Sequence, residues 1–143
     1  MPTFSGSCLC RAVTYQGKAE LGGGHCHCTA CRKSSGTSHC SHMIVTESDF
    51  RLTGELRFYD SAADSGNLVS RGFCPNCGSA IYSKNSSMPG MVFVRASSLD
   101  TPEVFQPQMV VYAANAVSWS QINADLPHFD SMPSAEDIAA MMA

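Results

Sequence analysis

The residues best suited to chemistry in this chain of 143 amino acids are its eight cysteines, seven of which fall into three close groups. The groups are Cys8 with Cys10, then Cys26, Cys28 and Cys31, then Cys74 with Cys77. The cysteine fraction lies below the ~8–10% that marks a disulfide scaffold. Close cysteine pairs in a reducing compartment are typical of metal ligands. The spacing therefore predicts metal sites rather than disulfides.

The sharpest single motif is the C-x-x-C turn Cys74-Pro75-Asn76-Cys77-Gly78. Proline fixes φ early in such a turn, and glycine after the second cysteine tolerates a left-handed backbone. A tetrahedral zinc ion needs two more ligands, and Cys8 and Cys10 are the natural donors. On an extended strand these two lie ~6–7 Å apart, farther than the roughly 3.8 Å between sulfurs around zinc. We therefore expect a bend at Cys8–Cys10 and a closed, structural site of four thiolates. Core thiols and a redox C-x-x-C are the alternatives, but the βαβ context of a thioredoxin-like motif is absent.

Cys26, Cys28 and Cys31 form a second cluster that could share one metal ion. Three protein ligands with an open position are the pattern of a catalytic zinc, where water or substrate takes the fourth place. A fourth protein ligand would instead close the site, and spacing alone fits both arrangements equally. The candidates for that ligand are His25, His27, His39, His42 and Cys40. For Cys40 the simplest alternative is a small apolar residue in a strand of the core.

Positive residues follow this cluster directly at Arg32 and Lys33, and Arg71 and Arg95 occur farther along the chain. Zinc held by three thiolates carries a formal negative charge, which a bound thiolate substrate would increase. Nearby cations would offset that charge. For any one of these side chains, the alternative is an ordinary solvated surface charge.

Composition excludes several classes of protein. Apolar residues make up 44% and charged residues 15%, which fits one folded domain over residues 1–143. The net charge of −3 argues against a broadly basic nucleic-acid binder. The longest near-apolar stretch, Met109–Val117, is far short of the ~20 residues of a spanning helix. The start lacks a basic region followed by an apolar one, so no secretory signal is predicted and we expect a cytoplasmic protein without a membrane partner.

Short runs rich in β-branched and aromatic residues alternate with turn-forming residues, which predicts strands. The runs are Ala12–Tyr15, His39–Val45, Phe50–Leu56, Leu68–Phe73, Ala80–Ser83, Met91–Arg95 and Met109–Tyr112, with turns at sites such as Gly22–Gly24. The only helix expected is a short C-terminal one over Ala135–Ala143, started by Ser134 with Asp137. We therefore predict a mainly β fold: a compact, multi-sheet structure stapled by zinc, whose terminal helix provides packing or a homodimer contact.

The cysteine segments together resemble the glutathione-dependent formaldehyde-activating enzyme family, which is shared with centromere protein V. The matching segments are Gly6-Ser7-Cys8-Leu9-Cys10, the run from Cys26 to Gly36, the run from Arg71 to Ser79, Leu99-Asp100, Trp119 and Leu126-Pro127. The resemblance covers about residues 4–130, and the order and spacing of the seven cysteines are highly specific to it.

The resemblance implies a mostly β fold with two zinc ions per chain. Cys8, Cys10, Cys74 and Cys77 match the structural site, and Cys26, Cys28 and Cys31 match the catalytic site. The implied activity joins formaldehyde to glutathione to give S-hydroxymethylglutathione, a carbon–sulfur lyase reaction. A small thiol and a small aldehyde are thus the expected partners, with Arg32 and Lys33 steering carboxylates of the thiol.

The chain departs from this family at several positions. Arg11 stands where glycine is common, and His39-Cys40 replaces a pair that is usually aromatic or apolar. Val110 and Ala116 occupy places where many members carry histidine and a basic residue. The cysteines are unaffected, so these departures bear on the substrate rather than on the metal sites.

Two other functions fit the same residues. A zinc-stabilised binding module without catalysis would use Cys26–Cys31 only to hold a loop, and a fourth protein ligand would favour it. A redox or metal sensor would use Cys40 beside the three-cysteine cluster, with oxidation releasing the metal.

Overall fold

The computed structural model describes residues 3–18, 22–63 and 65–142. The chain divides into two compact units. The first unit comprises Met1–Gly23 and His42–Gln106, and the second comprises Gly24–Ser41 and Pro107–Ala143. Each unit is described by itself below.

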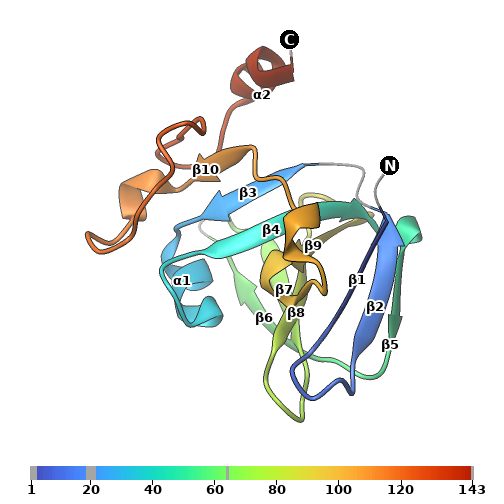
Figure 1. The fold of residues 1–143 in the computed structure, drawn as a ribbon. Helices are drawn as coiled ribbons and strands as arrows, with labels where there is room; N and C mark the ends of the chain where they lie inside the picture. Colours follow the sequence, from blue (N-terminus) through green and yellow to red (C-terminus); the bar gives the residue numbers. More distant parts are fainter. Residues whose placement is uncertain (1–2, 19–21, 64, 143) are drawn as a thin grey trace. The chain divides into compact units, whose positions relative to one another are not determined.

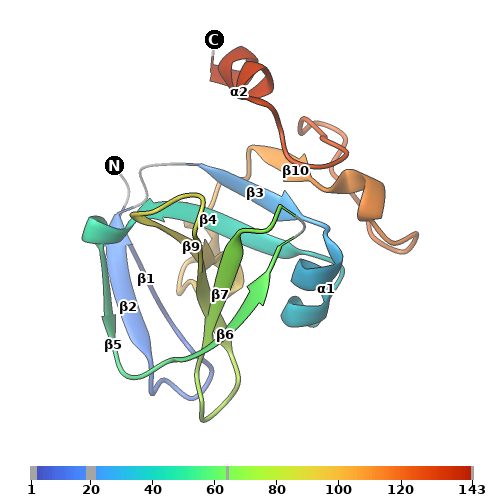
Figure 2. The same cartoon turned by 180° about the vertical axis from the view of Figure 1, so that it is seen from behind.

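One sheet of the first unit is antiparallel, with its strands in the order β1-β2-β5. These strands are β1 (Thr3–Ser7), β2 (Thr14–Lys18) and β5 (Phe50–Thr53), and they lie side by side in Figures 1 and 2. Tyr15 anchors the sheet, since its ring contacts Phe4 and Phe50 at centroid distances of 6.1 and 5.3 Å. Aromatic side chains on neighbouring strands are a main source of sheet stability.

A second antiparallel sheet of the first unit has the strand order β4-β9-β8-β7-β6. The strands are β4 (Cys40–Thr46), β6 (Arg57–Ala62), β7 (Leu68–Phe73), β8 (Ala80–Asn85) and β9 (Met91–Arg95). Short 3₁₀ turns occur in this unit at Glu47–Asp49, Ala96–Ser98 and Pro102–Val104. The sheet brings side chains that are far apart in the sequence onto one face.

The core of the first unit contains Phe4, Cys8, Val13, Tyr15, Met43, Val45, Cys74, Ile81, Val92, Val94, Ala96 and Leu99. The β-branched residues of β4 and β9 suit this position because they pack well on a pleated surface. Two of the cysteines, Cys8 and Cys74, are thus part of the apolar core. A metal ion bound by these cysteines would therefore link residues of the core directly to one another.

The second unit has one parallel strand pair, β3 (Gly23–Cys26) with β10 (Met109–Val111). It also contains α1 (Thr29–Ser35), a 3₁₀ turn at Ala113–Asn115 and α2 (Ala135–Met142). Its buried cluster consists of Cys26, Cys31 and Cys40, with Val111 and Tyr112 packed against it. Cysteine is the main buried residue type here, so the local packing and the candidate metal cluster share the same side chains.

The mainly β class with a short C-terminal helix is confirmed. Each of the seven predicted runs overlaps an observed strand, and two, Leu68–Phe73 and Met91–Arg95, match the observed bounds. In α2 the predicted capping box is present: Asp137 N–H donates to Ser134 Oγ at 3.1 Å, and Ser134 N–H donates to Asp137 Oδ2 at 2.9 Å. The last residue of the predicted helix, Ala143, lies outside the described residues. Over the part of the chain that is described, no helix has both the length and the apolar character needed to cross a membrane.

Three sequence predictions were wrong. The C-terminal helix is not the only one, because α1 follows the three-cysteine cluster directly. Strands β1, β3 and β6 were not predicted, and the supposed turn Gly22–Gly24 instead leads into β3 at Gly23. Strand β6 shows no alternation of apolar and polar residues because five of its six residues are exposed. A strand of this kind gives no two-residue period in the sequence.

Candidate metal centres

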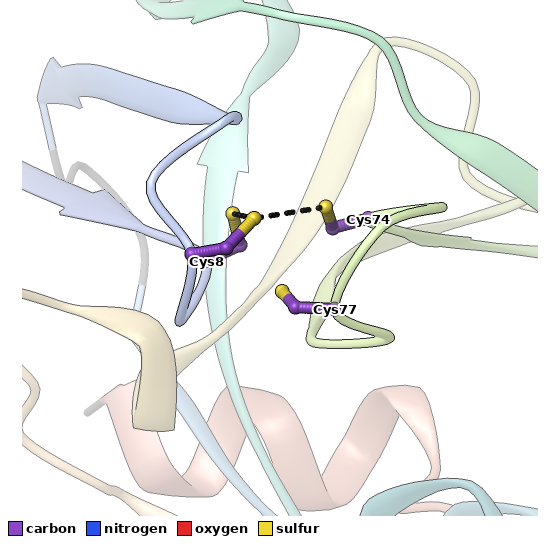
Figure 3. Close-up of side chains that lie close together, drawn as sticks. Cys8, Cys74 and Cys77 are labelled. Atoms are coloured by element: carbon purple, nitrogen blue, oxygen red, sulfur yellow. Dashed lines mark hydrogen bonds between the residues drawn. The ribbon is translucent and has the colours of Figure 1, made fainter.

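The first cluster brings together four cysteines from two turns of the first unit. Cys8 and Cys10 lie in the turn after β1, and Cys74 and Cys77 lie in the turn between β7 and β8. Their four sulfur atoms lie within 4.8 Å of one another. The Cys8–Cys10 and Cys10–Cys74 sulfur distances are 3.6 and 3.8 Å, and Figure 3 shows Cys8, Cys74 and Cys77 converging. These separations match the roughly 3.8 Å expected between sulfurs around a tetrahedral zinc.

The bend predicted at Cys8–Cys10 is present. Strand β1 ends at Ser7, and Arg11 N–H donates to the Cys8 carbonyl at 3.2 Å. In the second turn, Gly78 has the left-handed backbone predicted for it, with φ of 80°, and its N–H donates to the Cys74 carbonyl at 2.8 Å. Backbone hydrogen bonds therefore shape both turns that carry the cysteines.

Ser79 links the two cysteine turns. Its Oγ accepts a hydrogen bond from Leu9 N–H at 3.0 Å and lies 3.2 Å from Cys77 Sγ, to which it can donate its proton. The Ser79 hydrogen bond is the main reason that the pKa of Cys77 falls to about 5. In the same cluster the Asn76 side chain is the largest cause of a lowered pKa at Cys10. Hydrogen bonds to the charged form favour it, so these contacts suit thiolates.

The chemistry of this donor set fits a metal ion, and zinc in particular. Val13 N–H points at Cys8 Sγ at 3.3 Å, which is a further donor to a sulfur that would carry negative charge. No disulfide joins any of the eight cysteines. Four soft thiolate ligands at tetrahedral spacing are typical of zinc or iron–sulfur sites. The cluster can therefore hold one ion with a closed set of protein ligands.

The turn after Cys10 contains a strained residue, because Arg11 has φ of 68°. A left-handed conformation costs a residue with a Cβ atom ~1–2 kcal/mol, whereas glycine adopts it freely. We expect Arg11→Gly to raise the free energy of unfolding by up to about 1 kcal/mol, because the greater freedom of glycine in the unfolded chain offsets part of the gain. Urea unfolding of the zinc-loaded protein measures this. Arg11→Val is the matched control and should lose stability, and a glycine variant less stable than the wild type would contradict the argument.

The second cluster lies in the second unit, where Cys26 ends β3 and Cys28 and Cys31 flank the start of α1. The three sulfur atoms lie within 4.8 Å of one another. Cys28 is the N-cap of α1, and its Sγ accepts a hydrogen bond from Cys31 N–H at 3.3 Å. A side chain that accepts from the first helical turn stabilises the helix start. The helix and the cluster therefore depend on the same sulfur.

The three thiols of this cluster differ in acidity. Hydrogen bonds from Cys26 and Cys31 lower the pKa of Cys28 to about 2. The bond to Cys28 is the main cause that raises the pKa of Cys26 to about 12, and the pKa of Cys31 is also raised, mainly by Cys26. These hydrogen bonds favour the ionised form of Cys28 and the neutral forms of Cys26 and Cys31. A divalent cation would allow all three to ionise.

Cys40 lies beside Cys31 rather than among all three sulfurs. Its side chain is buried, and its S–H donates to the Cys31 carbonyl at 3.2 Å. The Cys40 sulfur lies within 4.8 Å of the Cys31 sulfur, but among the described residues it is not grouped with Cys26 and Cys28. The seven cysteines therefore gather as four plus three, the grouping that their spacing suggested.

Three histidine rings contact one another in this unit, one pair edge-to-face and one pair tilted, and this arrangement was not predicted from the sequence. The His39 ring lies 4.9 Å from His25 and 4.8 Å from His27, centroid to centroid. His39 Nδ1 bonds Ser38 Oγ and His25 Nδ1 bonds Ser41 Oγ, at 2.9 and 2.8 Å. Burial lowers the pKa of both His27 and His39, which favours neutral rings. The only signal in the sequence is the presence of His25, His27 and His39 around the cysteines.

Arg32 and Lys33 lie in the last turn of α1. Positive charge at that end of a helix interacts favourably with the helix dipole. Arg32 is half-buried and Lys33 is exposed. The two residues directly follow Cys31 in the chain. Their role toward a substrate stays a prediction.

Comparison with known proteins places the chain in a family. The model of the family described as "Glutathione-dependent formaldehyde-activating enzyme" matches residues 3–115. Among curated proteins, none is a significant match to the chain. The crystal structure of a Rhodobacter sphaeroides protein, a structural-genomics target, is similar in fold, with a TM-score of 0.57 and 20% identity over 72% of this chain and 96% of that one. The chain belongs to the glutathione-dependent formaldehyde-activating enzyme family.

Proposed function

We propose that this protein is a zinc-dependent enzyme of the carbon–sulfur lyase type, which adds a small thiol such as glutathione to formaldehyde or a related small aldehyde. Family membership over residues 3–115 supports the reaction class. The observation that carries the proposal is the cluster of Cys26, Cys28 and Cys31, whose sulfurs lie within 4.8 Å of one another. Three protein thiolates leave a coordination position for a substrate, as in catalytic zinc sites.

The two clusters have different roles in this proposal. Cys8, Cys10, Cys74 and Cys77 supply four ligands, which is a complete set for zinc, and two of them are core residues. A complete set leaves no place for a substrate, so this site is structural. Cys26, Cys28 and Cys31 hold the catalytic ion.

The reaction joins the sulfur of the thiol to the carbonyl carbon of the aldehyde. The C–S bond forms, the π electron pair of the C=O bond moves to oxygen, and the proton lost by the thiol ends on that oxygen. Zinc at the three-cysteine cluster would supply the positive charge that keeps the substrate sulfur ionised near neutral pH.

The chain's own groups act around this chemistry. Cys31 N–H holds Cys28 Sγ in place at 3.3 Å. Arg32 and Lys33, which follow the cluster on α1, attract the carboxylates of a peptide-like thiol. The two cationic side chains bind and orient the thiol in this proposal.

The test compares zinc-loaded wild type with Cys28→Ser in the presence of formaldehyde and several thiols: glutathione, cysteine and 2-mercaptoethanol. Adduct formation is followed by NMR exchange spectroscopy, with the uncatalysed rate subtracted. We expect catalysis by the wild type with at least one thiol and a fall to the background rate in Cys28→Ser. Circular dichroism checks that the variant remains folded.

Cys40→Ser is the second variant, because Cys40 is the buried cysteine beside Cys31 that would be the fourth ligand if the site were closed. It should keep the wild-type rate. A wild type that never exceeds the background, or a Cys28→Ser variant as fast as the wild type, would overturn the enzymatic proposal and leave the zinc-stabilised binding module.

A further inference from the structure

The three-stranded sheet of the first unit lines a cavity that the proposed reaction does not use. The cavity has a volume of about 490 Å³, within the ~300–1,000 Å³ of typical small-molecule sites, and it is open to solvent. Besides β1, β2 and β5, its lining includes residues of the 3₁₀ turn Glu47–Asp49 and of the segment 101–104. Asp100 N–H donates to the Ser5 carbonyl at 2.9 Å, and Asp100 Oδ2 accepts from Ser5 Oγ at 2.8 Å. These bonds hold the segment 101–104 beside β1, so hydrogen-bonded backbone bounds the cavity on that side.

Strand register places the polar lining residues of the sheet on one face. Ser5 lies directly opposite Gln16, and Gln16 lies directly opposite Arg51, so these three form a row across β1, β2 and β5. Thr3 and Lys18 lie opposite each other and form a second row on the same face, because each is two residues from a member of the first row. All five residues are exposed, so a ligand can reach this face without displacing the core.

Two of these residues are cations, and they lie close together. Lys18 is two residues from Gln16 and is therefore the diagonal neighbour of Arg51 on β5. Diagonal neighbours in a sheet lie ~7–8 Å apart, which is within reach of long side chains. Neither cation forms an ion pair within the described part of the chain. Asp49 is the one acidic residue of the lining, so the cavity carries a net positive charge although the whole chain carries −3.

The other polar groups of the lining suit the hydroxyl groups of a ligand. Gln16 offers an amide that donates and accepts, Asp49 a carboxylate that accepts, and Ser48 a hydroxyl that does both. Among the residues that the structure describes, none of these three side chains has a hydrogen-bond partner. The only aromatic residue of the lining, Phe4, is 6% exposed, so the cavity lacks the flat aromatic surface on which a nucleic-acid base stacks.

We propose that this cavity binds a small polyhydroxylated anion, namely a sugar phosphate or a sugar acid. The phosphate or carboxylate group lies between Lys18 and Arg51, which bind oxyanions through charge-assisted hydrogen bonds and offset the repulsion between the two cations. The hydroxyl groups of the ligand contact Gln16, Ser48 and Asp49. This inference does not rest on the proposed reaction, because every lining residue belongs to the first unit and the proposed catalytic cysteines belong to the second.

The test is an NMR titration of the zinc-loaded protein without thiol or aldehyde. Backbone amide signals of β1, β2 and β5 are followed as glucose 6-phosphate, gluconate or glucose is added at constant ionic strength. We expect saturable shifts with at least one of the two anions. Glucose should bind about tenfold more weakly or not at all, because it lacks the charge that Lys18 and Arg51 attract. Saturation by glucose 6-phosphate alone identifies a phosphate ligand, and saturation by gluconate alone identifies a carboxylate ligand.

Arg51→Gln and Lys18→Gln should each weaken binding of the anion about tenfold or more, because each removes charge-assisted hydrogen bonds. Both residues are exposed, so circular dichroism should show an unchanged fold. Arg57→Gln is the matched control, since it removes one positive charge from an exposed residue of β6 outside the cavity and should leave the affinity unchanged. Shifts that stay linear with all three probes, equal affinity for glucose, or an equal loss of affinity in Arg57→Gln would overturn the site.

Discussion

Replacing Cys74 by serine is expected to unfold the first unit. Cys74 is 0% exposed and belongs both to the core and to the four-cysteine cluster. Structural zinc sites contribute ~10–16 kcal/mol of apparent binding free energy, which is comparable to the ~5–15 kcal/mol of net stability of a whole domain. A serine hydroxyl is a poor substitute for a thiolate ligand, so the variant loses both the ion and the fold that depends on it.

Far-UV circular dichroism and the zinc content of the purified Cys74→Ser protein provide the measurement. Cys40→Ser is the control, because Cys40 is another buried cysteine whose sulfur lies outside the four-cysteine cluster. The control should keep two zinc ions per chain and a cooperative unfolding transition. A Cys74→Ser variant that unfolds cooperatively within about 1 kcal/mol of the wild type would show that the cluster does not stabilise the unit through a metal.

Chelation of the zinc-loaded protein is expected to release one ion from each cysteine cluster, in separate stages. The three-cysteine cluster offers one protein ligand fewer than the four-cysteine cluster. The ion with fewer protein ligands should leave first, without a change in secondary structure. The ion at the four-cysteine site should leave later, together with loss of the β signal, because metal binding there is part of folding.

A metal-sensitive dye and circular dichroism, recorded in parallel after addition of a chelator, separate these stages. Removal of the first ion should stop the proposed reaction while the fold persists. Release of both ions in one phase, or a total of one ion per chain, would contradict the division into an open and a closed site.

Most strands that bury one face were predicted from the sequence, and β1 is the exception. Met91–Arg95 alternates half-buried Met91 and Phe93 with buried Val92 and Val94, and its bounds were predicted as observed. Strand β6 was missed because nearly all of its side chains are exposed, and β3 because its two glycines are typical of turns. Helix α1 was missed because it has seven residues and its N-cap is a cysteine rather than serine or threonine. Local patterns fail when the signal comes from tertiary contacts or from a metal ligand.

The two cysteine clusters were predictable because their ligands come in short motifs that need only one bend, at Cys8–Cys10. The buried contact of Arg95 with Ser83 was not. It forms because the register of β8 and β9 places the two side chains on one face. Register depends on the pairing of whole strands, and a shift of one residue would have sent each side chain to the opposite face. No spacing in the sequence contains that information.

The separation of 64 residues between Cys10 and Cys74 has a consequence for biosynthesis. At ~5–20 residues per second, a ribosome needs on the order of ten seconds to add the second half of this ligand set after the first. Cys26, Cys28 and Cys31 are complete well within that interval. The nascent chain therefore offers six thiols before the partners of Cys8 and Cys10 exist, and an ion captured early can bridge the wrong sulfurs. The yield of correctly assembled protein in a cell should accordingly depend on how metal is supplied during translation, and less on how much is added to the finished chain.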